Sequence, residues 1–159
     1  NERPIATEIT TMSAGPVRNL CGETALGDAF ALLADADGVV SNDSGLMHVA
    51  AAFGRPQAAV FGSSDPRHTP PGSARAQVLW LQLDCSPCFA RECPLGHTAC
   101  LTQIAPETVF EALSHAMANK DNPLKPGTYR APAWLPNGHS QTIWSARIAP
   151  RPVIAYRRA

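Results

Sequence analysis

Residues 41–48 read Ser41-Asn42-Asp43-Ser44-Gly45-Leu46-Met47-His48, a polar cluster between two apolar runs at 38–40 and 49–53. This order predicts a strand, a tight turn and a helix over about 44–53, with Gly54 as its C-cap. The start of a helix carries unpaired backbone N–H groups and a partial positive charge, so such a turn can hold a phosphate or grip a sugar. The same residue types are preferred N-caps, and the pattern alone favours neither interpretation.

Three further helices are predicted from apolar residues at helical spacing. The first covers residues 1–12 and stops before Gly15. The second has Thr24 as its N-cap and runs to about residue 36. The third has Pro106 in its first turn and ends near residue 118. The apolar faces of the three are Ile5, Ile9 and Met12; Leu26, Phe30 and Leu33; and Val109, Phe110 and Leu113.

Strands are predicted at 38–41, 57–61 and 78–83, and they alternate with these helices. Residues 17–20 fit either a short strand or an extended link. Short apolar strands alternating with amphipathic helices predict an α/β fold, a parallel sheet covered on both sides. Ligands of such sheets bind beyond the carboxyl ends of the strands, where Asp43 and Ser63 both fall. We therefore expect these two residues to line one crevice.

The composition excludes several classes of function. The 159 residues carry 13 basic and 13 acidic side chains, so no polyanion-binding surface and no nucleic-acid partner are expected. No apolar run approaches the length of a membrane span, and residue 1 does not open a signal peptide. The first residue is Asn1, and we expect the chain to be a piece of a longer protein.

Four of the five cysteines, Cys85, Cys88, Cys93 and Cys100, lie in one loop-like segment together with His97. Thiolates at such spacing can bind zinc, although the second pair is not a C-x-x-C motif. A cytosolic protein keeps its thiols reduced, which favours free cysteines over disulfides. A metal-binding or interaction module, disulfides and free thiols remain three open interpretations.

Four blocks of sequence carry a resemblance to a known family. They are Leu20-Cys21-Gly22-Glu23-Thr24-Ala25-Leu26-Gly27, the stretch 40–52 around the opening motif, Gly54-Arg55-Pro56, and Phe61-Gly62-Ser63-Ser64-Asp65-Pro66. Over residues 1–118 the chain resembles the ADP-heptose:lipopolysaccharide heptosyltransferases of glycosyltransferase family 9. The resemblance implies a GT-B architecture, in which two Rossmann-like domains enclose the active site. Residues 1–118 then correspond to the C-terminal, nucleotide-sugar-binding domain, incomplete at its N-terminus.

The resemblance also implies a reaction. Enzymes of this family transfer heptose from ADP-heptose, with inversion, to the inner core of lipopolysaccharide. The acceptor and the proposed carboxylate base belong to an N-terminal domain that is not in this chain, so no catalytic residue is expected here and the chain alone should be inactive. No cofactor and no metal at the donor site are expected. The implied location is cytoplasmic, at the inner face of the inner membrane, with peripheral association of the full enzyme.

The implied donor-binding residues are Thr24, Leu26, Asp43, Ser44, Gly45 and His48. The backbone N–H groups of Ser44 and Gly45 would face the diphosphate, and Gly45 would let the backbone approach closely. Asp43 would turn toward the sugar hydroxyls, because its carboxylate repels phosphate. His48 lies one helical turn after Ser44. It would donate a hydrogen bond to the diphosphate; the alternative is that it is an ordinary helix histidine.

Thr24 and Leu26 resemble family positions close to the adenine; their alternative roles are N-cap and core. Residues 63–71 are a second candidate lining loop or a proline-stiffened surface turn. We favour the surface turn for Arg67 and His68.

Residues 119–159 form a predicted linker and irregular tail. Residues 129–144 resemble the start of YheT-like α/β-hydrolases, whose catalytic residues lie far downstream. A fragment of such a hydrolase is therefore an alternative function. Trp134 and Trp144 are expected to pack against other parts of the molecule.

Overall fold

The structure, a computed structural model, describes residues 3–118, 128–129 and 141–142. Its elements are α1 (Arg3–Met12), α2 (Leu26–Asp35), β1 (Val39–Asn42), α3 (Gly45–Ala52), β2 (Gln57–Phe61), β3 (Ala76–Trp80), α4 (Ala99–Thr102), α5 (Pro106–Ala118), β4 (Thr128–Tyr129) and β5 (Gln141–Thr142). Within the expected tail, β4 and β5 form a short antiparallel pair. The rest of the tail, with Trp134 and Trp144, lies outside the described residues.

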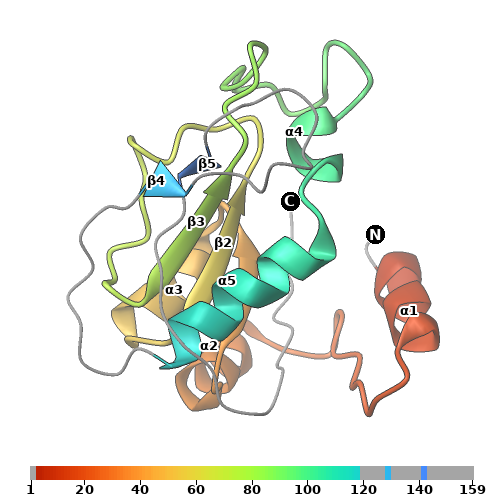
Figure 1. Cartoon of the computed structure of the whole chain (residues 1–159). Helices are drawn as coiled ribbons and strands as arrows, with labels where there is room; N and C mark the ends of the chain where they lie inside the picture. Colours follow the sequence, from red (N-terminus) through yellow and green to blue (C-terminus); the bar gives the residue numbers. More distant parts are fainter. Residues whose placement is uncertain (1–2, 119–127, 130–140, 143–159) are drawn as a thin grey trace.

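Strands β1, β2 and β3 form a parallel sheet in that order, with Val39 beside Gln57 and Gln57 beside Ala76. Helix α5 crosses one face of the sheet, and α2 and α3 lie on the other (Figure 1). All of β3 and most of β2 are buried, as expected of parallel strands covered on both sides. The predicted α/β fold class is confirmed.

Two layers of core side chains hold the helices to the sheet. Because side chains alternate along a strand, neighbouring residues of β2 serve opposite faces. On one face Met47 of α3 packs with Phe61 and Trp80. On the other, Ala58 and Leu79 pack against Ala112 and Leu113 of α5. The core thereby fixes the start of α3 at the carboxyl edge of the sheet.

Helix α1 forms over the predicted residues, but none of them is buried. Figure 1 shows α1 standing apart from the sheet. The apolar face predicted for α5 is partly wrong, since Phe110 is exposed whereas Leu113 and Ala116 are buried. The buried residues of α5 all lie within Ala112–Ala116, and Phe110 precedes that stretch. No helix in the described ranges is long and apolar enough to cross a membrane.

Two predicted elements have boundaries that need correction, and one helix was not predicted. Strand β3 begins at Ala76 and ends at Trp80, earlier than predicted, because Gln82 adopts a left-handed conformation with φ of 49° that a strand cannot continue through. Helix α4 lies in the cysteine segment, where no helix was predicted. Residues 17–20 form no strand, which leaves the link of the two alternatives.

The other corrected boundary is the start of α2, where the N-cap is Ala25 and not Thr24. The side chain of Asp28 accepts a hydrogen bond from the backbone N–H of Ala25 at 2.8 Å. The Asp28 carboxylate, within the first turn of α2, thus accepts from a backbone N–H at the helix start. A hydroxyl side chain at the N-cap is therefore not required.

Candidate functional site

The segment from β1 to α3 has the predicted order of strand, turn and helix. Ser44 is the N-cap in an extended conformation, and its Oγ accepts a hydrogen bond from the backbone N–H of Met47 at 3.3 Å. The same N–H also donates to the carbonyl oxygen of Ser44 at 3.1 Å. At the other end Phe53 is the C-cap, and Gly54, with φ of +64°, follows it in the left-handed position. The Ser44 side chain is therefore used by the protein itself, as the N-cap of α3.

The backbone at the start of α3 remains available to a ligand. The N–H groups of Gly45 and Leu46 occupy the first helical positions, which have no acceptor within a helix. Gly45 is exposed, and a Cβ added there would meet no atom within 4 Å. No protein atom therefore crowds the position that a side chain at Gly45 would take.

Asp43 ties this turn to the neighbouring strand. Its backbone N–H donates to the carbonyl oxygen of Val60, near the end of β2, at 3.1 Å. The Asp43 residue is half-buried and Ser44 is buried, whereas His48 is exposed one helical turn further on. The structure therefore brings together four of the six predicted residues: Asp43, Ser44, Gly45 and His48.

The remaining two predicted residues lie where α2 begins. Thr24 and Leu26 are both exposed, so Leu26 is not in the core, and the cap of α2 is Ala25, not Thr24. Helix α2 packs against α3 through Leu33 and Ala50. A role of Thr24 and Leu26 in ligand binding stays a prediction.

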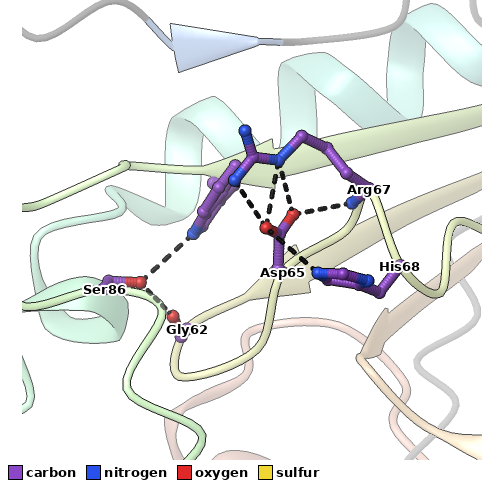
Figure 2. Close-up of polar contacts among 6 residues, drawn as sticks. Gly62, Asp65, Arg67, His68 and Ser86 are labelled. Carbon is purple, nitrogen blue, oxygen red and sulfur yellow. Dashed lines mark hydrogen bonds and ion pairs between the residues drawn. The ribbon is translucent and has the colours of Figure 1, made fainter.

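A second polar turn follows β2 and contains an ion pair that the sequence did not indicate. Figure 2 shows the Asp65 carboxylate facing Arg67 and His68. The carboxylate accepts from the Arg67 backbone N–H at 2.8 Å and from its Nη2 at 2.6 Å, and the His68 Nε2 lies 3.9 Å away. Hydrogen bonding from the Arg67 side chain is the largest cause that lowers the pKa of Asp65 to about 2.

This ion pair belongs to a wider set of contacts. The Arg67 guanidinium lies 5.3 Å from the centroid of the Trp80 ring, a cation–π arrangement. The Trp80 indole N–H donates to Ser86 Oγ at 3.2 Å, and the Ser86 hydroxyl donates to the Gly62 carbonyl (Figure 2). Arg67 and His68 are exposed, as predicted, but Arg67 also fixes the turn. The signal that was missed is an acid and a base two residues apart beside a proline.

Asp43 and Ser63 follow neighbouring strands of the sheet, as predicted. A cavity of about 470 Å³ lies beside β3, and neither residue lines it. Its walls are Pro66, Arg67, Pro70, Pro71, Ser73, Ala76, Val78, Trp80 and Gln82. A shared crevice of Asp43 and Ser63 therefore stays a prediction.

The cysteine segment contains free thiols, and none of the five cysteines forms a disulfide. Across the described part of the chain, no three His, Cys, Asp or Glu side chains are arranged to hold a metal ion.

Residues 1–99 match the family model of glycosyltransferase family 9 (heptosyltransferase). The chain belongs to this family. It is 38% identical over 117 residues to lipopolysaccharide heptosyltransferase 2 of Escherichia coli strain K12, covering 74% of this chain and 34% of that protein. It is 34% identical over 104 residues to lipooligosaccharide heptosyltransferase 2 of Campylobacter jejuni, covering 65% of this chain and 33% of the relative.

A solved structure of E. coli ADP-heptose lps heptosyltransferase II matches with a TM-score of 0.55 at 38% sequence identity. The match covers 69% of this chain and 31% of that one. The expected Rossmann-like sheet of a GT-B glycosyltransferase is confirmed by this likeness. The chain spans about a third of the length of the relatives it matches.

Proposed function

We propose that this chain is the donor-binding part of a heptosyltransferase that moves heptose from ADP-heptose to the lipopolysaccharide inner core, with inversion. The observation that carries the proposal is the turn at Ser44, which lies within the part of the chain that matches the family. Its side chain caps α3, while Gly45 holds the first helical position and a Cβ added there would meet no atom within 4 Å. A nucleoside diphosphate is an anion suited to that position.

Each residue of the turn has its own task in this proposal. The backbone N–H groups of Ser44 and Gly45 stabilise the negative charge that grows on the diphosphate as the glycosidic bond breaks. His48, exposed on the next turn of α3, donates a further hydrogen bond to the diphosphate. Asp43 accepts hydrogen bonds from sugar hydroxyls, and its tether to Val60 holds it in place at the edge of the sheet.

The adenine is assigned to the start of α2. Leu26 is 67% exposed there, so it offers an apolar surface to the face of a base. The neighbouring Thr24 is exposed and is not used as the helix cap, so its hydroxyl is available to a ligand. These two facts support the proposed contact of Thr24 and Leu26 with adenine.

The acceptor, the inner core of lipopolysaccharide, would be held by a separate domain of the full enzyme. Residues 1–118 then act as a donor-binding unit, followed by a linker and tail over 119–159, and they should have no transferase activity by themselves. The full enzyme would work in the cytoplasm at the inner face of the inner membrane, through peripheral association.

Calorimetric titration of ADP into the Gly45→Ala and Gly15→Ala variants tests the proposal. A Cβ would meet no protein atom at either glycine, and neither has a left-handed φ, so both variants should fold normally. At Gly45 the methyl group would stand between the helix start and the diphosphate. We expect roughly tenfold weaker binding in Gly45→Ala and none of this loss in Gly15→Ala. Unchanged ADP affinity in folded Gly45→Ala would contradict the proposal.

A further inference from the structure

Strand β3 forms an edge of the parallel sheet, and among the described strands of that sheet it pairs with β2 alone. All five of its residues are nevertheless buried. Leu79 packs on the side of α5. Because side chains alternate along a strand, Ala76, Val78 and Trp80 serve the other face, and all three line the cavity beside β3. Met47 of α3 covers part of this face, and the cavity adjoins the remainder.

The described walls of this cavity are mainly apolar. Pro66, Pro70 and Pro71 contribute to them together with the side chains of β3. Arg67 is the charged residue among the described walls, and the Asp65 carboxylate accepts from its Nε at 2.9 Å and from its Nη2 at 2.6 Å. The two charges therefore largely offset each other. A volume of about 470 Å³ lies in the range of pockets that hold small organic groups, so the cavity suits an uncharged aromatic or aliphatic side chain.

Strand β5 brings the last described residues of the chain to β3. Cα atoms of the two strands approach within 8 Å, and Figure 1 shows β5 next to β3. Residues 143–159 lie outside the described residues, and their sequence begins with Ile143 and Trp144 directly after β5. Successive Cα atoms are about 3.8 Å apart, so the Cα of Trp144 lies no more than about 7.6 Å from that of Thr142. An indole therefore follows closely after a strand that lies beside the cavity-lining strand.

Other parts of the tail fit this cavity less well. Trp134 is seven positions before Gln141, whereas Trp144 is two positions after Thr142. The later part of the tail carries arginines at positions 151, 157 and 158. Burial of an unpaired guanidinium among apolar side chains is unfavourable. The distance along the chain and the apolar walls both favour the segment that directly follows β5.

We propose that Ile143 and Trp144 dock in the cavity beside β3, with the Trp144 indole packed against Val78 and Trp80. An indole removes a large apolar area from water, and two aromatic rings in contact add an offset or edge-to-face attraction. The docked segment fastens the tail to the donor-binding unit from within the same chain. This interaction surface is separate from the turn at Ser44, and it does not depend on heptose transfer.

The probe is fluorotryptophan, incorporated into the full chain and observed by fluorine NMR. The three tryptophans give three signals, which Trp134→Phe and Trp144→Phe assign. A soluble gadolinium chelate broadens the signals of exposed indoles, and Trp80, 4% exposed, is the buried reference. The Trp144 signal should broaden severalfold less than that of free fluorotryptophan and about as little as that of Trp80. Broadening of Trp144 equal to that of the free amino acid would overturn the proposal.

A matched pair of alanine substitutions connects this protection to the cavity. Ala76 lines the cavity, so Ala76→Leu extends a side chain into it. Ala52 is exposed on α3 and is not part of the described walls, so Ala52→Leu is the control. Ala76→Leu should shift the Trp144 signal and increase its broadening severalfold, whereas the control should leave it unchanged. An unaltered Trp144 signal in folded Ala76→Leu, or a response of Trp134 in its place, would contradict the docking.

A second variant keeps the test independent of the fold of Ala76→Leu, because it changes no residue of the described core. Trp144→Ser should shift and broaden the Trp80 signal, whereas Trp134→Ser should not. A Trp80 signal that is indifferent to Trp144→Ser would overturn the proposal. Protection of Trp144 that is lost on dilution would also overturn it, because a second copy would then supply the segment. Titration with ADP is a separate experiment, so the two proposals fail independently.

Discussion

Replacing Ser44 by alanine separates the capping role of its side chain from the ligand role of its backbone. Ser44 is 7% exposed, and its Oγ accepts from the Met47 N–H at 3.3 Å. Loss of a serine N-cap costs about 1 kcal/mol, within a range of roughly 0.5–2. The Met47 N–H keeps its second acceptor, the Ser44 carbonyl at 3.1 Å, so we expect no more than about 1 kcal/mol. For a domain of this size that corresponds to a decrease in Tm of roughly 4 °C.

The assay is thermal unfolding of the full chain by circular dichroism, with Ser44→Thr as the matched control. Threonine keeps the hydroxyl oxygen, so its Tm should stay close to that of the unaltered chain. Equal Tm values for all three proteins would refute the cap. Below the melting temperature, Ser44→Ala should bind ADP within about threefold of the unaltered chain, because the backbone N–H groups remain. Complete loss of ADP binding by folded Ser44→Ala would show that the hydroxyl itself holds the ligand.

Three other substitutions test the packing and the ion pair. Gly62→Ala places a Cβ 2.7 Å from Leu101 and should lower the free energy of unfolding in urea by about 1–3 kcal/mol, whereas an unchanged midpoint would mean the contact is loose. Met47→Ala empties a fully buried site and should cost about 2–5 kcal/mol in the same measurement. The pKa of Asp65 is about 2 in the fold, below its ordinary 3.8, so its stabilising effect is complete above pH 4 and is lost as the pH falls toward 2. Urea midpoints measured across that window should fall less steeply in Asp65→Asn, and equal slopes would exclude the ion pair with Arg67.

The elements that could be predicted from the sequence are those whose ends are determined by residues next to them in the chain. Strand β2 agrees with its prediction at both ends, because an apolar run is bounded by Pro56 and Gly62. Helix α3 begins beside Ser44 because the cap and the helix it starts are adjacent in the chain. Strand β3 was misplaced because its apolar run continues to Leu83, and only the φ of Gln82 shows that the strand has ended.

The features that were missed depend on contacts between distant residues or on backbone conformation. Trp80 lies under the Arg67 guanidinium because β3 runs beside β2, and nothing in the order of residues reports that stacking. The backbone of the cysteine segment includes Thr98 in the left-handed conformation, which this residue type seldom adopts and which the sequence does not indicate. For the turn at Ser44, the sequence left capping and anion binding as alternatives. The structure shows the side chain in the first role and leaves the backbone free for the second.

The most direct test of the central claim is amide mapping by NMR on the full chain, with ADP, AMP and ADP-heptose as ligands. ADP should shift the amide signals of Ser44 and Gly45, and AMP should shift them much less because it lacks the second phosphate. ADP-heptose should in addition shift Asp43, which is assigned to the sugar. If millimolar ADP leaves all three amides unmoved while the chain is folded, the turn does not bind the donor and the account is contradicted.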